Sequence, residues 1–241
     1  MIKLSERLKL IADQIPKGYS MIDVGTDHGF LPIYLWENKI CPKVIMADVS
    51  EGSLEKAAEN CRELYPEEEF DLRLGDGLKV ISCGEADACV IAGMGGILMT
   101  KILGEDTVKA KSIKKYILQP RISSGRLRHW LISNGFSITE DLLVEEGKYI
   151  CNVIGAVSEE NRNIHYLQEN LEEYKKMDSE DIRLDVPLWL KNEPLAALHI
   201  RRRIKSEEAI LENVIMGNDS LRKESVRKNI KYLKGLEHEI I

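Results

Sequence analysis

The sequence predicts an α/β fold in which a doubly wound parallel sheet ends in an antiparallel strand and is followed by a helical hairpin. Three observations support this prediction. A short apolar run near the N-terminus leads through a glycine-containing turn into a helix, strand and helix patterns then alternate up to about residue 158, and long polar helices follow. We therefore divide the chain into a sheet-containing unit, residues 1–158, and a helical coiled-coil unit, residues 159–241.

The turn after the first strand has the composition of a ligand-binding loop. The apolar residues Tyr19, Met21 and Ile22 lead into the sequence DVGTDHG, residues 23–29, and a helix is expected to begin near Pro32. Gly25 and Gly29 let the backbone approach a ligand closely. A dinucleotide-binding loop would carry a glycine where this chain has Asp27. The Asp27 carboxylate would repel a diphosphate but attract the sulfonium and ammonium of S-adenosylmethionine. An ordinary polar turn is the alternative that this motif alone leaves open.

Three further strands end in acidic or small residues. Residues 43–48 end in Asp48, 23 residues beyond Gly25, which is close to the spacing of a carboxylate that binds both ribose hydroxyls. Residues 70–74 lead to Asp76, which we expect to accept a hydrogen bond from an adenine amino group. Residues 88–92 end in Gly93-Met94-Gly95-Gly96, predicted to be a loop too small to occlude a ligand. Each acid alone is more often a cap or turn former, but three at equivalent strand ends indicate one cofactor site.

The candidate cofactor contacts lie in these four segments. They are Asp23, Gly25, Asp27, His28, Gly29, Asp48, Val49, Asp76, Gly77, Gly93, Met94 and Gly95. The main role expected for His28 itself is to cap the next helix.

The remaining elements of the first unit follow from periodicity. A leading helix is expected over residues 4–15, a helix from Ser50 through Leu64, a fifth strand over residues 116–118 and a helix over residues 124–134 that Gly135 ends. Residues 136–144 and 149–157 read as an antiparallel hairpin. That ending fits a methyltransferase better than a dehydrogenase.

Several of these segments together resemble a known family. The sequences DVGTDHGFLPIYL, ADVSEGSLEKAAEN, RLGDGL, IAGMGG and LQPR are similar to those of the bacterial tRNA (adenine-N1)-methyltransferases that modify position 22 of the D-loop, the TrmK-like family. The resemblance covers residues 4–157 through its motifs and the remainder through length and helical pattern. It implies a class I S-adenosylmethionine-dependent methyltransferase fold (Rossmann-like), S-adenosylmethionine as methyl donor, tRNA as substrate and a C-terminal helical coiled-coil hairpin. We expect no metal, and a monomer or weak homodimer.

The enzyme is expected to accelerate the reaction mainly by positioning the reactants. Adenine N1 already carries a lone pair, so the enzyme gains mainly by aligning it with the methyl group and excluding water. Asp27 is the first candidate for a catalytic carboxylate that stabilises the developing cationic ring; alternatively it holds the ammonium of the cofactor. The Asn/Asp-Pro-Pro-aromatic loop of many enzymes that methylate the exocyclic amine is absent, and Gln119 offers an amide contact instead. Tyr149 and Asn152 in the final hairpin are further candidate base contacts, although a strand tyrosine is usually part of the core.

The distribution of charged residues along the chain predicts where RNA binds. The formal net charge is −6, but residues 191–241 hold 11 Lys and Arg against 8 Asp and Glu, whereas residues 1–190 hold 23 against 32. The predicted RNA surface therefore includes Arg201, Arg202 and Arg203 in the hairpin. A solvated helix face with intrahelical acidic partners is the alternative. A second candidate patch comprises Lys109, Lys111, Lys114, Lys115, Arg121, Arg126 and Arg128.

The two long helices are expected over residues 194–216 and 220–240, around a turn at residues 217–219. Their apolar residues form the predicted seam: Leu198, Ile204, Leu211 and Val214 on the first, and Leu221, Val226, Ile230, Leu233 and Ile240 on the second.

Composition excludes other classes of protein. The five cysteines show no paired spacing and are interpreted as buried thiols of a cytoplasmic protein. The longest uncharged apolar run, residues 88–99, has 12 residues and is too short to span a membrane, and we expect no secretory signal. A methyltransferase of a small-molecule or protein substrate, or a non-enzymatic cofactor-binding adaptor, are the alternative functions.

Overall fold

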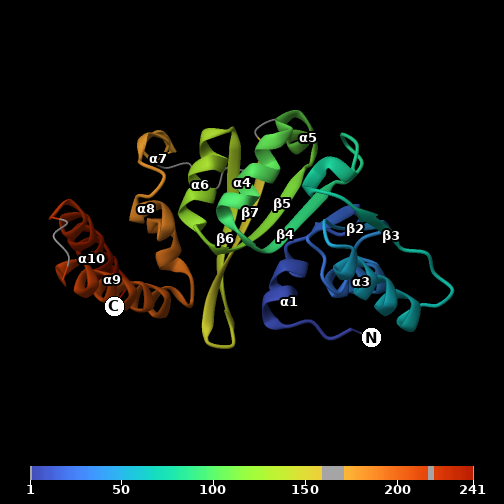
Figure 1. The fold of residues 1–241 in the computed structure, drawn as a ribbon, viewed down its shortest axis with the longest axis horizontal. Coiled ribbons are helices and arrows are strands. Elements are labelled where there is room, and N and C mark those ends of the chain that lie inside the picture. Colours follow the sequence, from blue (N-terminus) through green and yellow to red (C-terminus); the bar gives the residue numbers. More distant parts are fainter. Residues whose placement is uncertain (1, 159–170, 217–219, 241) are drawn as a thin grey trace.

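A seven-stranded sheet is the centre of the structure, a computed structural model that describes residues 2–158, 171–216 and 220–240. The strand order is β3-β2-β1-β4-β5-β7-β6 (Figure 1). The strands are β1 (Met21–Val24), β2 (Val44–Asp48), β3 (Asp71–Leu74), β4 (Ala88–Gly95), β5 (Lys115–Ile122), β6 (Phe136–Glu146) and β7 (Tyr149–Ser158). Pairing from β3 to β5 is parallel, and β7 is antiparallel to both β5 and β6. The predicted fold class is therefore confirmed.

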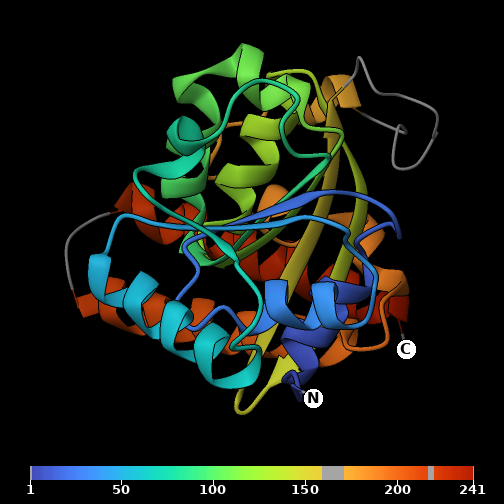
Figure 2. The same ribbon diagram turned by 90° about the vertical axis from the view of Figure 1, so that its right-hand side faces the viewer.

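Helices cover both faces of the sheet, as the two layers in Figure 2 show. The helices α1 (Glu6–Asp13), α2 (Phe30–Glu37) and α3 (Glu51–Leu64) pack on one face, and α4 (Gly96–Glu105), α5 (Thr107–Ser112) and α6 (Ser124–Ser133) pack on the other. Successive strand residues point to opposite faces, so Met21 packs with the first layer and Ile22 with the second. Both faces of the central strands are thus buried, which explains their continuous apolar runs.

The end of the fourth strand differs from the prediction. Residues 93–96 were expected to form a loop, but β4 continues to Gly95 and α4 begins at Gly96. Gly93 has a φ of +76°, and the pairing with β5 shifts register between Ala92 and Met94. The glycine thus forms a bulge within the strand, and pairing resumes after it.

The C-terminal helices form the predicted hairpin. They are α9 (Ala196–Met216) and α10 (Ser220–Ile240), and they lie side by side at the end of the molecule opposite α3 (Figure 1). Ile204, Val226 and Leu233 of the predicted seam are buried. Leu198 and Leu221 are 38% and 81% exposed, so including them in the seam was wrong. The predicted turn at residues 217–219 lies outside the described residues.

Short helices connect the hairpin to the sheet. They are α7 (Leu171–Lys176), α8 (Ile182–Asp185) and the 3-10 helix η3 (Leu188–Asn192). Tyr174 and Leu184 are buried in the same apolar cluster as the second helical layer of the sheet, while Ile182 packs against α9 and α10. The division of the chain after residue 158 stays a prediction, and α8 contributes to the apolar clusters of both the sheet and the hairpin.

Arg128 on α6 is the centre of a buried polar joint between the sheet and the C-terminal helices. Its side chain is 0% exposed and donates two hydrogen bonds to Asp141, at 2.7 and 2.8 Å, and one to Asn152 Oδ1 at 2.7 Å. Its Nη1 also donates to the carbonyls of Leu184 and Asp185, both at 3.0 Å. The guanidinium therefore fixes the position of α8 relative to the sheet.

The cysteines only partly match the prediction. Cys41, Cys61 and Cys89 are buried, and burial raises the pKa of each of these thiols. Cys83 is exposed and Cys151 is half-buried, so describing all five as buried was wrong. Within the described ranges there is no helix long and apolar enough to cross a membrane, and no cluster of His, Cys, Asp and Glu with the geometry of a metal site.

Candidate active site

The carboxyl ends of β1, β2 and β4 bring the predicted cofactor residues to one edge of the sheet. Asp23 and Gly25 lie at the end of β1, Asp48 ends β2, and Gly93 and Met94 lie in the last part of β4. The register pairs Asp23 with Met46 on one side and with Val90 on the other, so the three strand ends are adjacent. This edge of a parallel sheet is the usual place for a ligand in such folds.

Asp23 is a buried carboxyl group without a cationic partner. Its residue is 8% exposed, and among the described residues no lysine or arginine pairs with it. Burial, together with the negative charge of Asp48, raises the pKa of Asp23 to about 6, although a hydrogen bond with the Thr26 side chain acts in the opposite direction. A ligand carrying a positive charge would stabilise the ionised form of this carboxyl group.

Two glycines beside Asp23 have positive φ angles, and they differ in the space around them. Gly25 has a φ of +85°, and a Cβ added there would lie 2.2 Å from Met94 Cε. Gly93 has a φ of +76°, and a Cβ there would meet no atom within 4 Å. The space above Gly93 is therefore open at the strand end, while the Met94 side chain lies against the turn after β1.

The acids at the ends of β2 and β3 have different surroundings. Asp48 is half-buried and its Oδ1 accepts a hydrogen bond from the Ser50 backbone N–H at 2.7 Å, which leaves its other oxygen free for a hydroxyl group. Asp76 is exposed and pairs with Lys79 at 2.7 Å. Val49, beside Asp48, is 67% exposed, as expected for an apolar side chain that a ligand covers.

Asp27 and His28 lie on the outer side of the same turn. Asp27 Oδ1 is 3.0 Å from Lys56 Nζ, and this hydrogen bond lowers the pKa of the Asp27 carboxyl group. The His28 ring stacks on Phe30 with 5.3 Å between ring centroids. The N-cap of α2 is Gly29, with no side-chain cap, so the expected capping role of His28 was wrong.

Gln119 is buried between β4 and β5. Its residue is 2% exposed, and its Oε1 accepts hydrogen bonds from the Gly93 N–H and from Arg7 Nη1, both at 3.1 Å. Its Nε2 donates to the Pro120 carbonyl at 3.2 Å. The side chain thus satisfies the N–H that the bulge at Gly93 removes from the strand ladder, and it does not reach the surface.

The other predicted base contacts are divided by their exposure. Tyr149 is 62% exposed at the tip of the β6–β7 hairpin, with Lys148 Nζ 5.3 Å from its ring centroid. Asn152 is 8% exposed, and its Oδ1 accepts a hydrogen bond from Arg128. Asn152 therefore belongs to the buried contacts of Arg128 and is not placed to touch a base.

The predicted arginines of the second patch also differ from one another. Arg121 is exposed, and no hydrogen bond or ion pair involves it in the part of the chain that the structure describes. Arg126 pairs with Glu180 on the surface. Arg128 is fully buried, so its inclusion in a surface patch was wrong.

The three consecutive arginines of α9 have separate partners. Arg201 pairs with Glu237 at 2.7 Å. Arg202 donates to the Lys148 carbonyl at 3.1 Å, at the hairpin tip. Arg203 pairs with Asp185 at 2.9 Å and with Glu207, and its Nε is buried. Arg203 therefore belongs to the joint between α8 and α9.

Two contacts at this edge were missed in the sequence. Arg7 reaches Gln119 across 112 residues of chain, and Lys56 reaches Asp27 across 29. No local pattern marks either cation, since each lies on an ordinary amphipathic helix. Only the packing of these helices against the strand ends reveals them.

The fold and this edge define a class of protein. A sheet of this order with an antiparallel β7, a glycine turn after β1 and an acid at the end of β2 is the fold of the class I S-adenosylmethionine-dependent methyltransferases. The chain belongs to the methyltransferase domain family, whose model matches residues 4–154.

Individual relatives narrow the comparison. The chain is 37% identical over 145 residues to the tRNA (adenine(22)-N(1))-methyltransferase of Bacillus subtilis (strain 168), and the aligned segment covers 60% of this chain and 61% of that protein. The crystal structure of the B. subtilis M1A22 tRNA methyltransferase TrmK matches with a TM-score of 0.80 at 26% identity, with 100% of both chains covered. The structure of Sp1610 from Streptococcus pneumoniae in complex with S-adenosyl-L-methionine matches with a TM-score of 0.79 at 25% identity, and covers 98% of this chain and 100% of that chain.

Proposed function

We propose that this protein transfers a methyl group from S-adenosylmethionine to N1 of an adenine in tRNA, at position 22 of the D-loop. The observation that carries the proposal is the set of cofactor-binding features at the carboxyl edge of the sheet, in a chain 37% identical over 145 residues to an enzyme of that name. The similarity to the structure of B. subtilis TrmK extends over the whole chain, including the C-terminal helices, and supports the same assignment.

The residues of the edge fit S-adenosylmethionine. Asp23 offers a buried carboxylate to the ammonium of the cofactor, and Asp48 offers one to the ribose hydroxyls. Asp76 and Val49, both exposed, are the proposed contacts of the adenine ring. Gly93 leaves open space at the end of β4, whereas Gly25 makes room for the Met94 side chain.

The protein's contribution to the reaction is mainly positioning. The cofactor supplies an electrophilic methyl group when bound. Gly93 and Met94 lie in the last part of β4, beside the proposed cofactor site, where the target adenine would have to align with the methyl group. Asp27 stays a proposed contact for the adenine or the ammonium; in either role its carboxylate must exchange the ion pair with Lys56 for the new partner.

Cofactor affinity should depend on pH through Asp23. Its pKa in the free protein is raised to about 6, so the carboxyl group is ionised at pH 7 and mostly protonated at pH 5. Because only the carboxylate attracts the ammonium, calorimetry should show affinity about tenfold weaker at pH 5 than at pH 7. Asp23→Asn should bind weakly at both values. Equal wild-type affinity at pH 5 and pH 7 would remove Asp23 from the site.

The raised pKa of Asp23 also affects the free energy of unfolding. A carboxyl group whose pKa is raised on folding opposes folding above that pKa, and the penalty disappears as the pH falls below about 4. Asp23→Asn should therefore make the cofactor-free protein more stable at pH 7, although the cofactor binds it less tightly.

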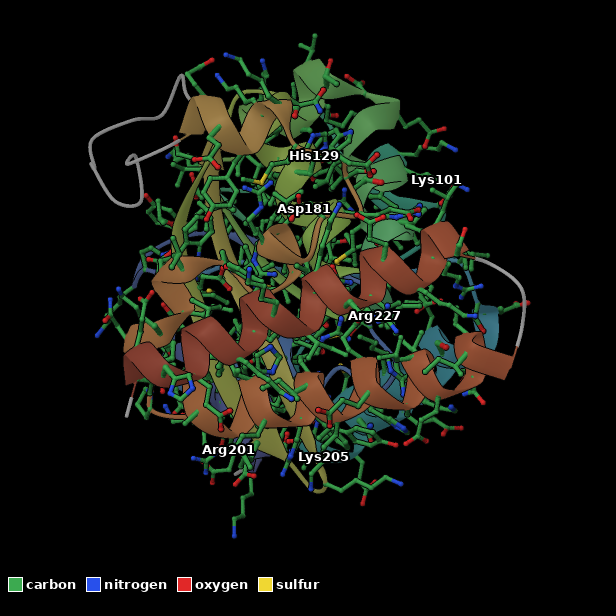
Figure 3. The ribbon with its side chains drawn as sticks, turned by 90° about the vertical axis from the view of Figure 1, so that its left-hand side faces the viewer. Lys101, His129, Asp181, Arg201, Lys205 and Arg227 are labelled. Carbon is green, nitrogen blue, oxygen red and sulfur yellow. The ribbon has the colours of Figure 1, made fainter. Side chains whose placement is uncertain are left out.

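The proposed RNA surface is one edge of α9. Leu198, Arg201, Arg202 and Lys205 lie on one helix face and line a hollow of about 360 Å³, to which Glu208 and Glu237 also contribute. Arg201 and Lys205 project from this edge in Figure 3, and Arg202 contacts the tip of the β6–β7 hairpin. Lys205 has no ion pair within the described ranges. A phosphate bound here would lie beside the tip of the β6–β7 hairpin, which Arg202 contacts.

Dependence on RNA separates the proposed function from its alternatives. Methyl-labelled cofactor should label unmodified tRNA, and ribonuclease should release that label completely. Label that stays in protein or in a small molecule after ribonuclease treatment would indicate another substrate. Tight cofactor binding with no transfer to any tRNA would instead support a cofactor-binding adaptor.

A further inference from the structure

Arg7 reaches the carboxyl edge of the sheet from α1. Its Nη1 donates to Gln119 Oε1 at 3.1 Å, and its Nε lies 3.5 Å from Glu146 Oε1. The Arg7 side chain is still 23% exposed. The guanidinium is therefore held by acceptors from β5 and β6 while part of it faces solvent.

The orientation of the Gln119 amide is determined by its neighbours. The Gly93 N–H and the Arg7 guanidinium are donors only, so both require the amide oxygen, and the Pro120 carbonyl is an acceptor only, so it requires the amide nitrogen. Because Gln119 is 2% exposed, this arrangement leaves it no open surface for a substrate. Gln119 thus presents Arg7 to the solvent at the strand end.

Glu146 completes the support of Arg7. Its Oε2 accepts a hydrogen bond from the Arg7 backbone N–H at 3.4 Å, in the first turn of α1, while its Oε1 faces the guanidinium. The side chain of Arg7 is consequently ordered before any ligand arrives, which lowers the entropy cost of binding one.

A second arginine, Arg121, lies near the end of β5, the strand that also carries Gln119. Burial raises the pKa of the Cys151 thiol, and the positive charges of both Arg7 and Arg121 act in the opposite direction. Both guanidinium groups are therefore near the start of β7, where the β6–β7 hairpin meets the carboxyl edge. Two cations at this place match the charge of a nucleic-acid backbone.

We propose that Arg7 binds a backbone phosphate beside the target adenosine, with Gln119 and Glu146 as positioning residues that act through it. This inference rests on the proposed function. A base that reaches the strand ends must leave its stack, and the flanking phosphates must then be held in a new position. A guanidinium with free N–H groups suits a phosphate, and Glu146 balances its charge near the cationic product. Gln119 then does not touch the base, in contrast to the role expected from the sequence.

Arg7→Ala tests the proposal through binding of an unmodified tRNA transcript. The affinity should fall about tenfold, and the dependence of affinity on salt should decrease by about one phosphate contact. Cofactor affinity and the melting temperature should stay unchanged. Arg7→Lys should restore the salt dependence but only part of the affinity, since lysine keeps the charge without the planar fork. Lys9→Ala, on the same helix and paired with Asp13, is the matched control and should change nothing.

The double variant identifies the role of Gln119. If Gln119 acts through Arg7, the variant with both Arg7→Ala and Gln119→Ala should bind tRNA no more weakly than Arg7→Ala alone. Additive losses would show that Gln119 contacts the RNA itself. An unchanged salt dependence in Arg7→Ala would overturn the phosphate contact. These results are distinct from failure of the proposed function, in which the wild-type protein would methylate no tRNA at all.

Discussion

Arg128→Ala should lower the free energy of unfolding by about 3 to 5 kcal/mol in a urea titration. The substitution leaves the buried Asp141 carboxylate with the Trp189 indole N–H as a remaining donor, and it leaves the carbonyls of Leu184 and Asp185 without their partner. An unpaired buried charge is more costly than the hydrogen bonds themselves.

A surface pair on the same helix provides the control for Arg128. Arg126→Ala removes the exposed pair with Glu180 and should change stability by less than about 1 kcal/mol. If Arg128→Ala does not fold, Arg128→Lys keeps the charge and gives a milder loss that is still measurable. A loss below about 1 kcal/mol in Arg128→Ala would contradict the buried joint.

Reversing two charges on α9 should weaken tRNA binding about ten- to hundredfold at low salt. The variant carries Arg201→Glu and Lys205→Glu, which place two negative charges on the proposed RNA surface. The dependence of affinity on salt should decrease by about two phosphate contacts, because fewer counterions are released on binding. Cofactor affinity should be unaffected, since the cofactor is proposed to bind at the ends of β1, β2 and β4, and in the described residues Arg201 pairs only with Glu237 of α10.

The matched control for α9 lies on the other side of the hairpin. Lys228→Glu with Lys231→Glu makes the same change in net charge on α10, beside η3, and should weaken tRNA binding much less. Equal losses in the two double variants would show that the effect comes from net charge alone. A greater loss in the α10 variant would move the RNA surface to that side.

The parts of the fold that follow from local patterns were predicted correctly. Asp23 lies one residue before the end of β1 and Asp48 ends β2, and the apolar run before each acid is short enough to identify a strand. The hairpin around Gly147 follows from two apolar runs and a turn between them. In contrast, residues 88–99 are continuously apolar, and such a run does not reveal where β4 ends and α4 begins.

The parts of the site that depend on distant residues were not predicted. The excess of positive charge in the hairpin led to the prediction that Arg203 binds RNA. Arg203 instead pairs with Asp185, and this pair depends on how α8 packs against α9. Arg128 was likewise predicted to be a surface cation. Its partner Asp141 lies on β6, so the sequence around Arg128 does not reveal the pair. A sequence gives the charge of a side chain, whereas its availability depends on the tertiary contacts around it.

Mass spectrometry of nucleosides tests the central claim most directly. Unmodified tRNA is incubated with the protein and S-adenosylmethionine carrying a deuterated methyl group, digested to nucleosides, and compared with the same tRNA in which adenine 22 is replaced by guanine. We expect deuterated 1-methyladenosine from the first tRNA and none from the second. Deuterated N6-methyladenosine as the only product, or equal labelling of both tRNAs, would contradict the proposed reaction and its position.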